Sequence, residues 1–233
     1  MLPPGRTPSQ ADLAAIIDHT LLRPTAGPAD FDRLCDEAAR YAFWSVCVPP
    51  ARVPSSALRL KGTGVKVSTV VGFPLGYNSP ETKLSEAQRA ILAGADEIDM
   101  VMSLGAFKGG ELGLVSNEIA AVSSACRDSG RVLKVIIECC YLTDEEKVKA
   151  SKTAEEAGAH FVKTSTGFGP GGATSHDVAL IKAALSEKAR VKASGGISSL
   201  AKALEMVRAG ADRIGTSSGV SILEELANGP GTR

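Results

Sequence analysis

Three stretches of the sequence share one motif at a helix-to-strand boundary: "AGADEIDMV" (93–101), "AGAHFVKTS" (157–165) and "AGADRIGTS" (209–217). In each, the glycine suits the left-handed conformation in which many helices end, and the next alanine lets the following strand pack closely. An apolar run of strand length comes next. The copies are about two strand–helix units apart, so they mark every second strand of a longer alternation.

Strand and helix patterns alternate along the whole chain. Apolar runs of strand length occur at 16–21, 43–48, 65–71, 97–102, 133–139, 160–164, 190–193 and 212–215. Among the helical patterns between them, the stretch 143–158 begins with a capping box formed by Thr143 and Glu146. Alternation predicts an α/β fold with a parallel sheet, and eight units favour a closed (β/α)₈ TIM barrel. An open doubly wound sheet is the alternative, but no GxGxxG motif opens a helix after the first strands.

Length and composition fit one soluble barrel. The 233 residues are predicted to form a single catalytic domain, with a short N-terminal extension or helix and flexible tails at about 1–10 and 228–233. Lysine plus arginine equals aspartate plus glutamate, at 26 each, so no basic excess favours nucleic acid or a membrane surface. No apolar run is long enough to span a bilayer, and the first ten residues lack the apolar core of a secretory signal. The five cysteines follow no disulfide or zinc spacing, so we expect a cytoplasmic protein.

The motif also aligns polar residues on different strands. Four residues after its last alanine stand Asp99, Lys163 and Gly215. Alternate strands of a barrel contribute side chains to the same interior layer, so these positions are predicted to share one height, with the glycine leaving room for a ligand. Lys192 lies in the neighbouring seventh strand, just before a Gly-Gly turn. Both lysines should therefore lie close together near the C-terminal mouth, where barrel active sites form.

Each of these residues also has a purely structural interpretation. A strand lysine usually lies at a sheet edge or extends to solvent, and an aspartate near a strand end usually caps a turn. A closed barrel has no edges, however, and a second cation about 5 Å away lowers the pKa of a lysine, as does burial. A neutral lysine amine attacks carbonyl carbons to form a Schiff base, and a nearby carboxylate can move protons. Together, Lys163, Lys192 and Asp99 favour amine catalysis.

Two short segments indicate a phosphate site. "ASGGISS" (193–199) and "GTSSG" (215–219) follow the last two strands, and the backbone N–H groups of Gly195, Gly196, Ser217 and Ser218 can cradle an anion. Taken alone, each segment is more often a turn or a helix cap. Metal binding is not expected, because none of the three histidines has ligand spacing with another. One of them, His19, either lines the mouth or caps a segment.

Eight motifs, in order along the chain, resemble the deoxyribose-phosphate aldolase family. They are "IDHTLL" (17–22), "SVCVPP" (45–50), "VVGFPLG" (70–76), "EIDMVM" (97–102), "LKVIIE" (133–138), "VKTSTGFG" (162–169), "KASGGI" (192–197) and "ADRIGTSSG" (211–219). The resemblance covers nearly the whole chain. It implies a cofactor-independent class I aldolase with a (β/α)₈ barrel that reversibly cleaves 2-deoxy-D-ribose 5-phosphate to acetaldehyde and D-glyceraldehyde 3-phosphate. It also implies a homodimer or a larger homo-oligomer.

The resemblance assigns roles to particular residues. Lys163 forms the Schiff base, Lys192 lowers its pKa, and Asp99 relays protons. The implied phosphate contacts are Gly167, Gly195, Gly196, Ser217 and Ser218, and the positions that match the family's pocket are Thr20, Cys47 and Lys134. From the residues alone, a lone thiol such as Cys47 is more often a packed core residue than a pocket residue.

Three features depart from the family pattern. Phe168 and Ser198 stand where some relatives have lysine and arginine, so positive charge is missing near the expected phosphate. We therefore expect backbone N–H groups to hold the phosphate, with only modest discrimination against unphosphorylated deoxyribose. Longer relatives end in a tyrosine that reaches the site, whereas this chain ends "NGPGTR" (228–233). Two other functions remain open: a lysine-dependent, transaldolase-like aldolase with another donor, and a sugar-phosphate-binding barrel without catalysis.

Overall fold

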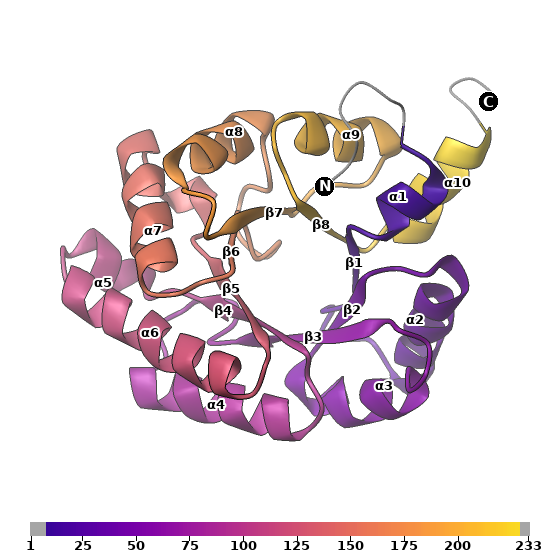
Figure 1. Cartoon of the computed structure of the whole chain (residues 1–233), viewed down its shortest axis with the longest axis horizontal. Helices are drawn as coiled ribbons and strands as arrows, with labels where there is room; N and C mark the ends of the chain where they lie inside the picture. The colour runs from indigo at the N-terminus through magenta and orange to yellow at the C-terminus, as the bar shows by residue number, and fades with distance from the viewer. Residues whose placement is uncertain (1–7, 229–233) are drawn as a thin grey trace.

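The computed structural model describes residues 8–228, which form a closed barrel of eight parallel strands in chain order (Figure 1). The strands are β1 (Ile17–Thr20), β2 (Ser45–Val48), β3 (Lys66–Val71), β4 (Glu97–Val101), β5 (Val132–Ile136), β6 (Phe161–Lys163), β7 (Arg190–Ser194) and β8 (Arg213–Thr216). All eight predicted strands are confirmed, and β8 pairs with β1 to close the barrel. The fold is the predicted TIM barrel and not an open sheet.

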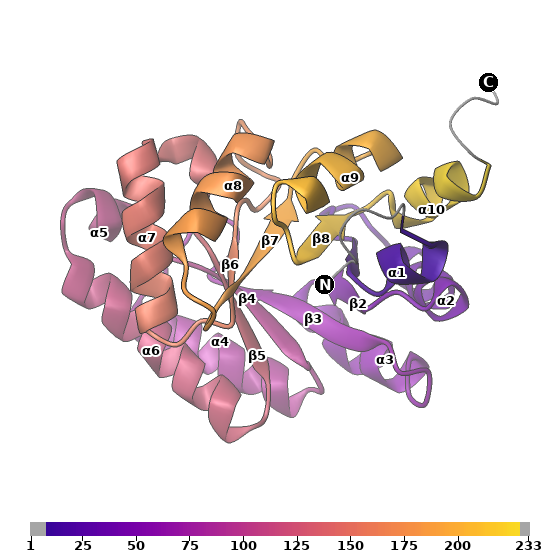
Figure 2. The same ribbon diagram turned by 45° about the horizontal axis from the view of Figure 1, so that its top comes forward.

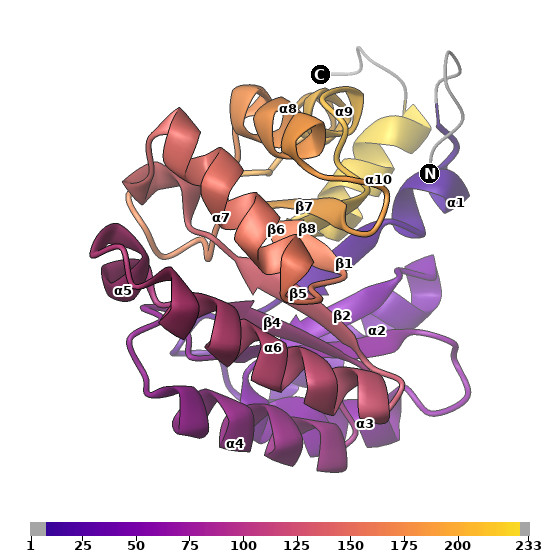
Figure 3. The same cartoon turned by 60° about the vertical axis from the view of Figure 1, so that its left-hand side comes forward.

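Helices surround the barrel on the outside, as the three views in Figures 1, 2 and 3 show. They are α1 (Gln10–Ala14), α2 (Pro28–Tyr41), α3 (Val53–Arg59), α4 (Pro80–Leu92), α5 (Leu104–Lys108), α6 (Leu112–Asp128), α7 (Asp144–Glu156), α8 (Ser175–Ala184), α9 (Leu200–Arg208) and α10 (Gly219–Asn228), with 3₁₀ turns at Pro50–Arg52 and Cys139–Tyr141. Within residues 8–228, no helix is both long and apolar enough to cross a bilayer.

The short N-terminal helix α1 packs beside α10, where the amide of Gln10 donates to the carbonyl of Leu223 at 2.8 Å. Ser9 caps this helix through a capping box. The predicted flexible tails fall mostly on residues 1–7 and 229–233, which lie outside the described residues, as does nearly all of the C-terminal "NGPGTR".

Helices begin and end where the local sequence signals predict. Thr143 and Glu146 make the expected capping box at the start of α7. The three motif glycines Gly94, Gly158 and Gly210 have φ values of 105°, 93° and 109°, so each ends its helix in the left-handed region that glycine tolerates. The motif therefore starts β4, β6 and β8 at equivalent points.

Strand parity separates an apolar layer from a charged interior. Ile98, Met100, Val162 and Ile214 belong to the buried core between strands and helices, as their parity predicts. Residues of the opposite parity face the barrel axis, and many of them are charged. In the strand register, Asp99 pairs with Lys134, while Lys163 pairs with Lys192.

Candidate active site

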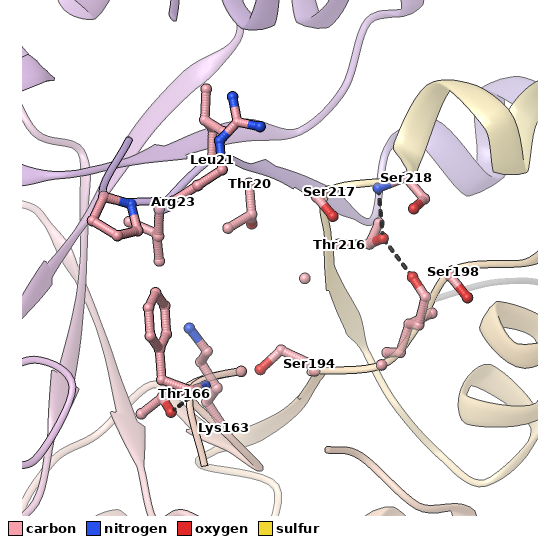
Figure 4. Close-up of a pocket in the computed structure, with 18 residues that line it drawn as sticks. Thr20, Leu21, Arg23, Lys163, Thr166, Ser194, Ser198, Thr216, Ser217 and Ser218 are labelled. Carbon is pink, nitrogen blue, oxygen red and sulfur yellow. Dashed lines mark hydrogen bonds between the residues drawn. The ribbon is translucent and has the colours of Figure 1, made fainter. Parts of the chain in front are cut away.

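A cavity of about 430 Å³ opens at the C-terminal ends of the strands, where barrel active sites are expected (Figure 4). Its lining comes from the segments that follow β1, β6, β7 and β8. The lining residues are Thr20, Leu21, Leu22, Arg23, Pro24, Lys163, Thr166, Gly167, Phe168, Ser194, Gly195, Gly196, Ile197, Ser198, Gly215, Thr216, Ser217 and Ser218.

Lys163 forms part of the cavity floor at the end of β6. Figure 4 shows its side chain directed into the space that Thr20, Ser194 and Ser217 surround. The residue is 3% exposed, and its Nζ lies 2.8 Å from Oδ2 of Asp99. Burial lowers the pKa of Lys163; the charge of Lys192 acts in the same direction, while Asp99 opposes both. Burial is thus a larger cause than the neighbouring cation.

Lys192 is the neighbouring cation on β7. Its Nζ lies 2.8 Å from Oδ2 of Asp99 and 2.5 Å from Oδ2 of Asp18. Burial alone would lower the pKa of Lys192, but the two carboxylates outweigh it and raise the pKa. Lys192 therefore holds its proton more strongly than Lys163 does, although the two lysines are paired in the sheet.

Asp99 is fully buried below the cavity and connects three lysines. Besides Lys163 and Lys192, it accepts a hydrogen bond from Nζ of Lys134 at 2.7 Å. Burial would raise the pKa of Asp99, yet the lysine charges, led by Lys134, hold it well below its ordinary value. Asp99 is therefore an ionised acceptor that orders the amines around it.

Below Asp99 and its three lysines lie further buried charged side chains that were not identified from the sequence. Nη1 of Arg213 lies 2.8 Å from Asp18 and 3.3 Å from Glu97. Glu97 and Arg213 lie two residues before Asp99 and Gly215 on the same strands. The parity rule that identified Asp99 could therefore also have identified Glu97 and Arg213. Asp18 is fully buried and faces the axis.

An anion cradle forms where the segments after β6, β7 and β8 meet. Gly167, Gly195 and Gly196 have positive φ values of 85°, 87° and 74°, and a Cβ on Gly195 would lie only 3.6 Å from Cα of Gly167. Within residues 8–228, the backbone N–H groups of these glycines and of Ser217 donate to no other protein group. Free N–H groups that line one cavity suit an anion. Ser218 differs, because its N–H donates to Oγ1 of Thr216 at 2.9 Å.

The three remaining sequence-predicted pocket residues occupy different places. Thr20 lines the cavity, and its hydroxyl donates to the carbonyl of Asp18 at 2.9 Å. Lys134 and Cys47 are completely buried and are not part of the lining. Burial raises the pKa of the Cys47 thiol, which keeps it neutral.

Two other residues that the sequence singled out differ from expectation in their details. His19 points away from the mouth and lies 2.9 Å from Glu37 on α2. Gly215 lines the cavity as predicted, but a Cβ there would lie 3.0 Å from Cε of Lys192. The room at this glycine is therefore occupied in part by the lysine and not left wholly to a ligand.

The cavity rim carries little charge. Phe168 and Ser198 line it as expected, and Phe168 packs edge-on against Phe73 at 5.3 Å between ring centroids. Apart from Lys163, the only charged side chain among the lining residues is Arg23, from the segment after β1. Nη2 of Arg23 lies 3.4 Å from the carboxylate of Asp30, in the first turn of α2. Sequence reasoning missed Arg23 because a loop has no parity to point its side chain.

The turn after β6 is supported from below by Glu138. This residue is 2% exposed and has a positive φ of 51°, which is uncommon for a residue other than glycine. Its carboxylate accepts from the backbone N–H of Thr166 at 3.1 Å and also from the Thr166 hydroxyl. Among the described residues, no group of three or more possible metal ligands occurs.

Comparisons with known proteins agree on one family. Residues 13–225 match the family model described as DeoC/LacD family aldolase. The chain is 55% identical to the deoxyribose-phosphate aldolase of Carboxydothermus hydrogenoformans, over 95% of this chain and 98% of the relative. It is 52% identical to that of Thermococcus kodakarensis, over 93% and 97%. The tetrameric deoxyribose phosphate aldolase structure from Aeropyrum pernix superposes with a TM-score of 0.87 at 37% identity, covering 94% of this chain and 92% of that one.

Proposed function

The chain belongs to the DeoC/LacD family of aldolases, and from this premise we propose that it reversibly cleaves 2-deoxy-D-ribose 5-phosphate into acetaldehyde and D-glyceraldehyde 3-phosphate. One observation carries the proposal. A buried lysine with a lowered pKa, Lys163, forms the floor of a cavity whose wall holds a cradle of free N–H groups. An amine nucleophile and an anion site in one cavity suit a phosphorylated aldehyde.

In the proposed mechanism, the neutral amine of Lys163 attacks the aldehyde carbon of the open-chain sugar, and loss of water gives an iminium ion. The bond between C2 and C3 then breaks, its electron pair moves toward the iminium nitrogen, and the C3 hydroxyl loses its proton. Protonation of the resulting enamine and hydrolysis release acetaldehyde. The ammonium of Lys192 and the carboxylate of Asp99 are adjacent to the amine, and we assign them the proton relay.

The phosphate is proposed to occupy the cradle made by Gly167, Gly195, Gly196 and Ser217, with the hydroxyl of Ser218 nearby. Arg23 also belongs to the cavity lining, and it is proposed to supply the positive charge that Phe168 and Ser198 do not. Thr20 is proposed to contact the sugar. Cys47 and Lys134 are assigned no direct contact, since both are completely buried and neither lines the cavity.

The proposal extends to assembly and location. The Aeropyrum pernix aldolase has a tetrameric structure, which supports a homo-oligomer for this chain. All five cysteines are free thiols, which is usual in a reducing compartment and supports a cytoplasmic location. The proposed chemistry needs no cofactor, because the lysine itself supplies the electron sink.

The test is reductive trapping. The enzyme is incubated with acetaldehyde and borohydride, and the modified residue is mapped by mass spectrometry. We expect an ethyl adduct on Lys163, and we expect Lys163→Leu to lose turnover while Lys188→Leu, at an exposed lysine, keeps it. Adduct formation without cleavage of deoxyribose 5-phosphate would indicate another lysine-dependent aldolase. No adduct, with sugar-phosphate binding retained, would indicate a binding protein.

A further inference from the structure

Seven charged side chains fill the barrel axis beneath the cavity. Each is at most 5% exposed. The acids are Asp18, Glu97 and Asp99, and the bases are Lys134, Lys163, Lys192 and Arg213.

These side chains form one connected network. At the bottom, Arg213 contacts Asp18 and Glu97 at 2.8 and 3.3 Å. In the middle, Nζ of Lys134 lies 2.5 Å from Glu97 and 2.7 Å from Asp99. At the top, Asp99 accepts from Lys163 at 2.8 Å. The carboxylates of Glu97 and Asp99, joined by Lys134, thus connect the guanidinium at the bottom of the barrel to the amine of Lys163 at the cavity floor.

The charges of the network cancel only when Lys163 is neutral. The three carboxylates match Lys134, Lys192 and Arg213, so a proton on Lys163 leaves one buried positive charge without a counterion. An unbalanced buried charge is costly, because the barrel interior solvates it poorly. Other groups that face Lys163 do not change the count. The Cys47 thiol on β2 is kept neutral by burial, and β3 contributes the Ser68 hydroxyl.

We propose that Arg213, which touches neither the cavity nor the proposed substrate, is a positioning residue that keeps Lys163 unprotonated by completing this balance. The inference rests on the proposed function of Lys163. Without the guanidinium, the network carries a net charge of −1. A proton then restores neutrality, and the most basic group free to take it is the neutral amine of Lys163. For charges of the order of 10 Å apart at an effective dielectric near 20, the shift is about one pKa unit.

Arg213→Met is a suitable test variant, because Arg213 packs 4.4 Å from the ring centre of Trp44 and 5.1 Å from that of Phe161. Methionine keeps an apolar contact with both rings. The readout is the rate at which acetic anhydride acetylates Lys163 as a function of pH, mapped by mass spectrometry, with circular dichroism to verify folding. We expect the midpoint to rise by about one pH unit in Arg213→Met and to stay at the wild-type value in Arg213→Lys.

Charge-compensated variants separate charge balance from packing. Glu97→Gln alone removes a negative charge, so the midpoint should fall. The double variant with Glu97→Gln and Arg213→Met is neutral again, so its midpoint should return toward wild type. If Arg213→Met does not fold, the acetylation midpoint of Lys163 in Glu97→Gln still tests whether the charge balance of the network sets the pKa of Lys163. An unchanged midpoint in either single variant, or no recovery in the double variant, would overturn the inference.

Acetylation does not require turnover, so the two proposals fail in different ways. A wild-type midpoint near 10.4, the value of an ordinary lysine, would contradict the proposed Schiff-base role itself. A depressed wild-type midpoint that Arg213→Met leaves unchanged would contradict only the role of Arg213.

Discussion

Lys163 and Lys192 pair in register on adjacent strands, and both side-chain nitrogens lie 2.8 Å from the same atom, Oδ2 of Asp99. One carboxylate oxygen therefore bridges the amine that we propose as the nucleophile and the amine of Lys192, whose pKa is raised. The arrangement brings the two nitrogens close without requiring both to be charged, since an uncharged amine still donates a hydrogen bond to a carboxylate.

Asp99→Asn should reduce kcat by about 100-fold or more, because it removes the carboxylate of the proposed proton relay and leaves Lys192 and Lys134 to repel each other. Ser68→Ala is the matched control, since its hydroxyl donates to the other oxygen of Asp99 at 3.1 Å. We expect a much smaller effect there. Equal losses in both variants, measured by steady-state kinetics on folded protein, would argue against a relay.

The pH dependence of kcat/KM should follow the proton on Lys163. Only the neutral amine attacks a carbonyl, so activity rises as pH increases through the pKa of Lys163. Because burial and Lys192 lower that pKa, the rise should occur below the 10.4 of an ordinary lysine. Lys192→Met removes the cation, which raises the pKa and moves the acid limb to higher pH. A limb that stays in place would contradict this role of Lys192.

Gly215→Ala should impair turnover by displacing Lys192. The added Cβ would lie 3.0 Å from both Cε of Lys192 and Cβ of Ser194, which is tighter than most real contacts. Gly113→Ala is the control, because a Cβ on Gly113 in α6 meets nothing within 4 Å. We expect unchanged kcat for Gly113→Ala, with a stability gain of at most about 1 kcal/mol.

Arg23 should determine part of the preference for phosphorylated sugar. We expect Arg23→Ala to lower kcat/KM for deoxyribose 5-phosphate about tenfold, which is typical of losing one charge-assisted hydrogen bond, and to leave unphosphorylated deoxyribose unaffected. Ser198→Arg should widen the gap between the two sugars. Parallel changes for both substrates would show that these positions act on folding or on the amine instead.

The capping box of α7 should contribute measurably to stability. Thr143→Ala removes the hydroxyl that accepts from Glu146 N, so the free energy of unfolding should fall by about 1 kcal/mol. Thr153→Ala, inside the same helix, removes only a hydroxyl that bonds the carbonyl of Lys149. Urea denaturation should find that variant no less stable than wild type, since alanine favours the helix.

The sequence predicted the fold and the top of the charge network because both depend on repetition. Glycines that end helices fix where strands start, and strand parity then fixes which side chains face the axis. The same rule reached Asp99 and Lys163, and the adjacency of the sixth and seventh strands reached Lys192. Strand parity also applies to Glu97 and Arg213, but the role proposed for them depends on the number of charges in the whole barrel interior.

Other features could not be predicted because they depend on distances across the fold. Burial is the largest cause of the lowered pKa of Lys163, and the extent of burial cannot be read from the sequence of one short strand. Asp18 lies in the predicted first strand, but only closure between β1 and β8 places it beside Lys192. Arg23 belongs to a connecting segment, where no periodicity assigns a direction to a side chain.

The rim and the floor of the cavity come from different parts of the chain. The floor includes Lys163, which belongs to a strand of the closed sheet. The rim residues Phe168, Ser198 and Arg23 belong to the connecting segments. Connecting segments tolerate sequence change better than barrel strands do. Substitutions at the rim should therefore change which aldehydes the cavity accepts while leaving Lys163 and the strand that carries it unaltered.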